Sequence, residues 1–289
     1  MYAEIDFLRA GMDGTMDGAS AKRRLKERHE KIRSDWAFIA ECNLGEQFMN
    51  DERIDRVRQI ASQTWERHLD DRIGLSHEEL ERKKRKPALD LPATEPLLAD
   101  RPEHLIERPG NGPIFGDNPH GFDMDVPEHL YNMGEIYNLC IPRGTLTAEE
   151  RFKINDHIIQ TINMLGRLPF PRELKRVTDW AGNHHEKLDG TGYPRRLGED
   201  ELSVPERIMA IADIFEALTA TDRPYMRPKT MSTALRIMGT MRDSGHLCPN
   251  LFDLFLTSEV WREYGEQHLQ PEQMDEVDLT ELRSSGVPG

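Results

Sequence analysis

Two histidines and two carboxylates stand out as residues that could bind a metal ion. His184 and His185 are followed by a run of turn formers at 189–194, which predicts that the backbone reverses directly after the imidazoles. Asp213 and Glu216 lie one turn apart on a later expected helix, so both carboxylates share a flank. Imidazole nitrogens and carboxylate oxygens are ligands for transition metals. The pattern indicates a candidate metal site.

A third imidazole lies on a helix that the sequence marks clearly. Thr147 and Glu150 have the spacing of a capping box, so a helix is expected to begin there. His157 borders its apolar stripe. The stripe consists of Ile154, Ile158, Ile162 and Leu165. A border position suits a ligand facing a cleft and equally an ordinary buried histidine, so position alone leaves both interpretations open.

Composition excludes some classes of function. The net charge of −14 argues against general nucleic-acid binding, which needs a basic surface. No apolar run is long enough to cross a bilayer. Cys42, Cys140 and Cys248 are scattered singly, without the close spacing of a zinc knuckle. We expect a cytoplasmic protein with no membrane span in this chain.

The first part of the chain is expected to be helical and then irregular. A charged helix is predicted over 21–43, with Leu25, Ile32, Trp36 and Ile39 as a narrow apolar stripe. The stripe could pack on the domain or pair with a second copy in a homodimer, and the spacing does not choose between these. A second helix is expected over 51–68.

Residues 69–127 are rich in proline, which breaks long helices. They include the basic run at 81–86, for which a solvated patch is favoured over contact with an acidic partner or nucleic acid. Further helices are expected over 128–140, 172–186 and from Ser203 onward. We therefore predict an all-α fold.

Two segments together resemble a known family. HHEKLDGTGYP at 184–194 and ADIFEALTATDRPY at 212–225 are similar to the signatures of the HD-GYP family, whose members are metal-dependent phosphodiesterases that hydrolyse cyclic di-GMP. The resemblance implies an HD-type helical bundle over 126–268. It would follow an N-terminal helical and proline-rich linker region at 1–125 and precede an acidic, disordered tail at 269–289.

The chain departs from this family at the His-Asp pair that defines it. Counting back from Thr147, with a short deletion, the corresponding stretch begins at Tyr131. Tyr131 then replaces the metal-binding histidine, Asn132 the bridging aspartate, and Glu135 a lysine that contacts the substrate phosphate. The resemblance therefore implies a degenerate, YN-GYP variant.

The resemblance also assigns roles to the remaining residues. His157, His184 and His185 would serve largely one metal and Asp213 the other, so a three-histidine site could hold one Fe, Mn or Zn ion, or none. A second group of residues resembles the family's substrate contacts and its GYP motif. The contacts are Tyr193, Arg223 and Arg227, and the motif is Gly192, Tyr193 and Pro194.

The function implied is that of a bacterial cyclic di-GMP signalling protein with lost or strongly reduced phosphodiesterase activity. It would act by binding the nucleotide or a partner protein such as a GGDEF-type diguanylate cyclase. The alternative is an active phosphodiesterase with a rearranged metal site, in which Asp123, Asp125 or His120 supplies the missing ligand.

Overall fold

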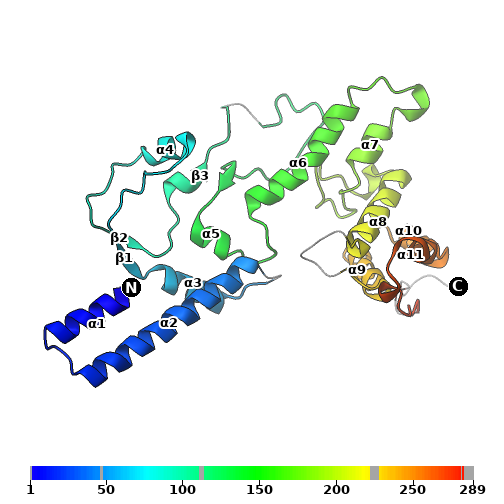
Figure 1. Ribbon diagram of the computed structural model, residues 1–289. Helices are drawn as coiled ribbons and strands as arrows, with labels where there is room; N and C mark the ends of the chain where they lie inside the picture. Colours follow the sequence, from blue (N-terminus) through cyan, green and yellow to red (C-terminus); the bar gives the residue numbers. More distant parts are fainter. Residues whose placement is uncertain (1, 46–47, 111–113, 222–227, 281, 283–289) are drawn as a thin grey trace. The chain divides into compact units, whose positions relative to one another are not determined.

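The computed structural model describes the chain except for residues 1, 46–47, 111–113, 222–227, 281 and 283–289. Within the described residues it has eleven α-helices and four short strands (Figure 1). The strands form only two two-stranded sheets, so the prediction of an all-α fold is confirmed. Among these residues, no helix has the length and apolar character that a membrane crossing needs.

The chain divides into two compact units. Unit 1 comprises 1–110 and 127–151, and unit 2 comprises 111–126 and 152–289. Each has its own apolar core.

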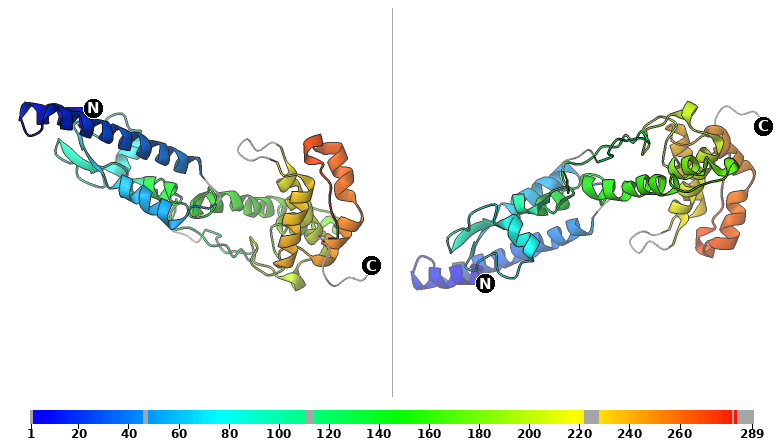
Figure 2. Two further views of the ribbon diagram at one scale, coloured as in Figure 1. Left: turned by 90° about the horizontal axis from the view of Figure 1, so that it is seen from below. Right: turned by 90° about the horizontal axis from the view of Figure 1, so that it is seen from above.

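Unit 1 is built on three helices. They are α1 (Tyr2–Met12), α2 (Gly18–Leu44) and α3 (Asp51–Ala61). α1 and α2 lie side by side as an antiparallel hairpin in Figure 1, and they overlap in the two views of Figure 2. The core forms where the C-terminal half of α2 meets α3 and α5 (Glu135–Leu139), and it includes Phe38, Val57 and Leu139. The helix predicted over 51–68 ends earlier than expected, because residues from Thr64 join a sheet.

That sheet pairs β1 (Thr64–Arg67) with β2 (Ala93–Pro96) in antiparallel register. The remaining elements of this region are short. They are α4 (His77–Lys83), η1 (Pro102–His104) and β3 (Leu105–Ile106). The proline-rich region is therefore not without structure. It contributes β2 to the sheet with β1, and β2 carries the buried carboxylate of Glu95.

The basic run at 81–86 is largely paired within the chain. Lys83 Nζ lies 2.6 Å from an oxygen of Asp71, and Lys84 Nζ lies 2.6 Å from one of Glu81. Arg82 donates to the backbone carbonyl of Glu103. These contacts agree with the interpretation of the run as a solvated patch.

The structure contradicts the helix predicted over 128–140. Tyr131 and Asn132 form strand β4 (Tyr131–Asn132), which pairs with β3. Helix α5 begins only after Gly134, where a carboxylate oxygen of Asp100 accepts the N–H groups of Ile136 and Tyr137. This cap comes from 36 residues away in the sequence, so local signals could not reveal it.

Unit 2 holds the remaining helices. They are most of α6 (Ala148–Leu165), then η2 (Arg172–Leu174), α7 (Val177–Gly182), η3 (Glu199–Glu201), α8 (Val204–Thr219), α9 (Met231–Asp243), α10 (Pro249–Thr257), α11 (Val260–His268) and η4 (Pro271–Gln273). The main core lies among α8 to α11 and centres on side chains such as Phe215, Leu235 and Phe252. A smaller core around Ile158 and Ile162 lies along α6.

The acidic C-terminal segment packs on unit 2 as far as it is described. The buried Gln273 donates from Nε2 to the carbonyls of Thr219, at 2.9 Å, and Lys229, at 3.1 Å. Asp275 accepts the N–H and hydroxyl of Ser232 at the start of α9. The sequence analysis expected this tail to be disordered. As far as it is described, the tail is instead held in place by the hydrogen bonds of Gln273 and Asp275.

We predict that the buried ion pair of β1 and β2 stabilises unit 1. Arg67 Nε and Arg101 Nη2 lie 2.6 and 2.7 Å from the two oxygens of Glu95, which is 5% exposed. The substitution Glu95→Gln removes the anion shared by the buried Arg67 and the partly exposed Arg101, leaves Arg67 with only Asp71 at 3.6 Å, and should cost about 3 kcal/mol of unfolding free energy at neutral pH. Urea unfolding followed by circular dichroism measures this.

The pH dependence of this contribution has a definite sign. Burial alone would raise the pKa of Glu95, but hydrogen bonds and charge from Arg101 and Arg67 outweigh it and lower the pKa. A lowered folded-state pKa stabilises the fold above the unfolded-state pKa, and this contribution is lost as pH falls through the folded value. The difference between wild type and Glu95→Gln should therefore shrink in acid. The exposed Asp90→Asn is the control, and an equal effect of both substitutions would contradict the prediction.

Candidate metal centre

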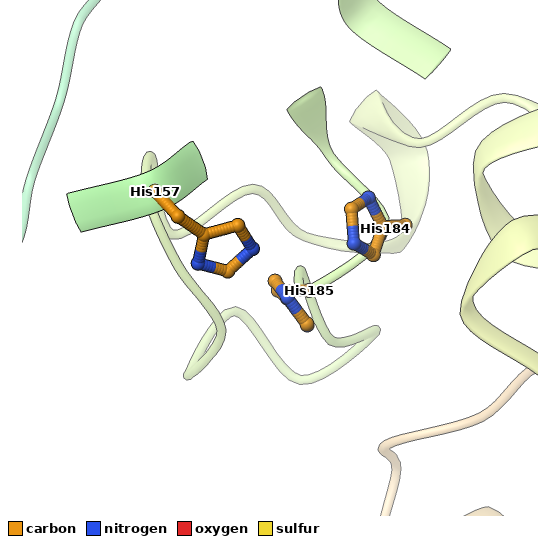
Figure 3. Close-up of side chains that lie close together, drawn as sticks. All are labelled: His157, His184 and His185. Carbon is orange, nitrogen blue, oxygen red and sulfur yellow. The ribbon is translucent and has the colours of Figure 1, made fainter. Parts of the chain in front are cut away.

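Three histidines converge in unit 2 (Figure 3). His157 projects from α6, while His184 and His185 lie in the turn that follows α7. The helix predicted over 172–186 is divided, and its regular part ends at Gly182. The imidazoles therefore come from the turn after the helix and not from its last residues.

Close packing of α7 on α6 brings these side chains together. A Cβ atom added at Gly182 would lie 2.4 Å from Cγ1 of Ile162, which is fully buried. A larger residue would have to displace the Ile162 side chain. Ile162 lies little more than one turn from His157, so α7 packs on α6 close to that histidine.

The nitrogen atoms are arranged as in a metal-binding site. One ring nitrogen from each of the three histidines lies within 4.8 Å of the others. His157 Nδ1 lies 2.6 Å from the Ile154 carbonyl oxygen, and His184 Nδ1 lies 2.7 Å from that of Ala181. A proton on each Nδ1 would be donated to these carbonyls, leaving the Nε2 lone pairs free for a cation. The donor set therefore fits one zinc, iron or manganese ion.

His185 has a different environment. Its Nδ1 lies 3.8 Å from an Asp213 oxygen on α8, and its ring stacks on Tyr193 with centroids 4.7 Å apart. Burial, together with the neighbouring His184 and His157, lowers the pKa of His185 to about 4, although Asp213 acts in the opposite direction. Burial and the charge of Asp213 raise the pKa of Tyr193 to about 12. At neutral pH the imidazole is uncharged, which is the form that binds metal.

The GYP turn is held by a residue that the sequence analysis did not single out. Glu186, 2% exposed, accepts the backbone N–H groups of Arg195 at 2.6 Å and Leu197 at 3.0 Å. Gly192 crosses close to its backbone, since a Cβ there would lie 2.4 Å from the Glu186 Cα. The carboxylate thus fixes the turn that carries Tyr193. The only available signal was its place beside the histidine pair.

A second buried carboxylate connects the histidine turn to α8. Glu206 accepts a hydrogen bond of 2.8 Å from Asn183 Nδ2, directly before the histidine pair. It also accepts the N–H and hydroxyl of Ser203 at the start of the helix. The predicted start of α8 is therefore confirmed, and the same carboxylate connects the turn to the helix that carries Asp213.

The residues that the sequence resemblance aligned with the family's His-Asp pair lie in unit 1. The Asn132 side-chain oxygen accepts the N–H of Gly134 at 2.9 Å. Glu135 accepts the N–H of Ala99 at 2.8 Å. Tyr131 belongs to β4. The three-histidine cluster includes none of them within the part of the chain that the structure describes.

The structure describes three of the other residues that the sequence analysis proposed as ligands or substrate contacts. Asp123 and Asp125 face Arg196, at 3.8 and 2.8 Å, and His120 lies beside Phe122 with ring centroids 5.5 Å apart. None of these three belongs to the described histidine cluster. The predicted nucleotide contacts Arg223 and Arg227 lie outside the described residues.

Comparison with known proteins agrees with this site. Residues 92–251, more than half of the chain, match the HD domain family. The chain belongs to this family of helical, metal-dependent domains, and its relatives are of the HD-GYP-like kind that the histidine and GYP motifs resemble.

Several characterised proteins are similar to part of the chain. The 3'3'-cGAMP-specific phosphodiesterase 1 of Vibrio cholerae is 45% identical over 145 residues, which cover 47% of this chain and 33% of that protein. A cyclic di-GMP phosphodiesterase of Thermotoga maritima is 34% identical over 134 residues, covering 45% and 35%. A cyclic di-GMP phosphodiesterase of Pseudomonas aeruginosa is 38% identical over 155 residues, covering 54% and 33%. The chain thus spans about a third of the length of these curated relatives.

We predict that Glu186 supports the turn beside the histidines. The substitution Glu186→Ala leaves two backbone N–H groups without their acceptor and should cost about 2 to 4 kcal/mol. Hydrogen exchange should show loss of protection at the amides of Arg195 and Leu197. The exposed Glu173→Gln serves as the control. Unchanged protection of both amides in Glu186→Ala would show that the carboxylate does not hold the turn.

Proposed function

We propose that this chain is a cyclic-dinucleotide signalling protein of the HD-GYP type in which phosphodiesterase activity is lost or strongly reduced. The observation that carries the proposal is the three-histidine cluster, taken together with the alignment that puts Tyr131 and Asn132 at the positions of the family's His-Asp pair. The relatives are named as phosphodiesterases of cyclic di-GMP or 3'3'-cGAMP, and this supports a cyclic dinucleotide as the class of ligand.

The residual metal site would consist of His157, His184 and His185, with Asp213 beside His185. When bound there, a divalent ion would supply positive charge and Lewis acidity toward a phosphate oxygen. The imidazoles are neutral ligands, and two adjacent cations need a bridging anion to hold them together. Asn132 offers only a neutral amide oxygen. This donor set favours one ion over two.

The residue at position 135 also favours reduced hydrolysis. If Glu135 takes the place of a lysine that contacts the substrate phosphate, the attraction between residue 135 and the phosphate becomes a repulsion. For unit charges about 4 Å apart in an effective dielectric near 20, the attraction and the repulsion are each about 4 kcal/mol. A substrate phosphate would then be held less firmly. Loss of the bridging carboxylate and loss of the cation together favour reduced turnover.

The GYP turn supports a role that does not need catalysis. Gly192, Tyr193 and Pro194 are retained, and buried hydrogen bonds to Glu186 hold the turn. We propose that this surface serves to bind a cyclic dinucleotide or a signalling partner, such as a GGDEF-type diguanylate cyclase. A cytoplasmic location would suit either role.

The rival function is active hydrolysis through a rearranged site. Asp123 and Asp125 would be the sources of the missing carboxylate, and His120 of an extra imidazole. Both acids lie in unit 2 with the histidines, but they now face Arg196. Recruiting either acid would separate it from this arginine.

Metal content and turnover separate the two functions. For protein purified without chelator we expect at most one metal ion per chain and no hydrolysis of cyclic di-GMP or 3'3'-cGAMP with added manganese or ferrous iron. Elemental analysis and chromatography of the products measure this. His185→Ala should lower metal content, whereas His68→Ala, at an exposed histidine of unit 1, should not. Two ions per chain together with turnover would establish the rival function.

Restoring the missing pair tests the alignment itself. In the double variant Tyr131→His with Asn132→Asp we expect more metal per chain than in wild type, because a bridging anion is supplied. The carboxylate introduced by Asn132→Asp can still accept the Gly134 N–H, so the local fold should persist. Gln59→Glu, which also adds one carboxylate in unit 1 but at an exposed position of α3, is the control. If the folded double variant binds no more metal than wild type, Tyr131 and Asn132 do not correspond to the family's His-Asp pair.

A further inference from the structure

The hairpin of α1 and α2 has almost no core of its own. Among the described side chains from Ala3 to Ala37, only Ala21 is buried. Isolated helices are marginal in water, and most helical stability in proteins comes from packing of an apolar face. A hairpin of this length therefore needs a covering partner for its apolar side chains.

The stripe noted in the sequence remains uncovered. Ile32 and Trp36, one turn apart on α2, are 44% and 75% exposed. The same helix packs on the rest of unit 1 through a different face, where Phe38 and Cys42 are buried. On α1, Met12 is 87% exposed. These side chains are free to contact another helix.

The two helices also leave a groove between them. Its lining combines apolar side chains of both helices with charged ones. The apolar ones include Ala3, Phe7, Ala10, Ala21 and Leu25, and the charged ones are Asp6, Arg24, Glu27, Arg28 and Lys31. A groove with both kinds of side chain between antiparallel helices can accept a further amphipathic helix, as in a four-helix bundle.

The charges of the hairpin identify the partner. Residues 22–33 of α2 hold seven basic side chains and two acidic ones. α1 is acidic, with Glu4 and Asp6 at its start and Asp13 just beyond its end, against the single Arg9, and of these acids Glu4 already lies 3.7 Å from His29 on α2 of the same chain. One chain thus presents both signs of charge on adjacent helices. A second copy related by a two-fold axis can place its acidic α1 opposite the basic α2 of the first, twice over.

We propose that the α1–α2 hairpin is a homodimer interface, in which two copies form a four-helix bundle with α1 of each facing α2 of the other. The interface buries Trp36 and Ile32. It lies wholly on unit 1 and requires neither a metal nor a nucleotide, so it stands apart from the proposed function.

Analytical ultracentrifugation of the full chain over a range of concentrations tests this proposal. The wild type should sediment as a dimer of the 33.4 kDa chain, and added salt should weaken it. Trp36→Lys should raise the dimer Kd by about tenfold or more, since a central aromatic is removed and two like charges are added. The matched control is Ile73→Lys, which is also 75% exposed in unit 1 but lies outside the hairpin. It should leave the Kd unchanged.

Two results would overturn the proposal. One is a wild type that stays monomeric up to about 100 μM, a concentration at which even weak specific dimers are populated. The other is an equal effect of Trp36→Lys and Ile73→Lys. If Trp36→Lys loses helix content by circular dichroism, Ile32→Lys replaces it, and a folded Ile32→Lys that dimerises like wild type would likewise refute the interface.

Discussion

The candidate site depends on one buried carboxylate that accepts two backbone N–H groups. Glu186 directly follows the histidine pair, and its oxygens hold the chain at Arg195 and Leu197. This closes the GYP turn back onto the histidines, so that Tyr193 stacks on His185. Burial raises the pKa of Glu186, while the two backbone donors act in the opposite direction. The protonation of Glu186 therefore depends on how deeply the carboxyl is buried and on whether the two backbone N–H groups stay bonded to it.

Charge balance connects the site to its proposed function. The three imidazoles are neutral ligands, and the described carboxylate beside them is Asp213, 3.8 Å from His185. One divalent ion can be accommodated with this limited compensation, but a pair of ions repel each other at short distance unless an anion bridges them. If Asn132 stands where the family has its bridging aspartate, as proposed, the site can stabilise fewer ions. This argument concerns charge, and it holds for iron, manganese and zinc alike.

Much of the fold could be predicted because its signals are local. The starts of α6 and α8 follow from capping residues a few positions apart, at Thr147 and Ser203. The histidine cluster was expected from the resemblance to the HD-GYP family, since the position of His157 alone left its role open. The strand at Tyr131 could not be predicted, because its partner β3 lies 25 residues earlier. The roles of Glu186 and Gln273 were equally hidden, since each acts through backbone groups that only the folded chain brings near.

The acidic character of the chain bears on how it could bind an anionic nucleotide. Two arginines follow the GYP turn, but Arg195 lies 3.3 Å from Asp179 and Arg196 lies 2.8 Å from Asp125. Their charge is therefore largely compensated within the chain. In the described residues around the histidines, positive charge for a phosphate could come from Lys187, whose Nζ lies 3.3 Å from the Thr191 hydroxyl, from a bound metal ion, or from separating these arginines from their acids. A bound ion would couple affinity for a cyclic dinucleotide to occupancy of the histidine cluster, and this coupling would give the site a reason to retain three imidazoles if turnover is reduced as proposed.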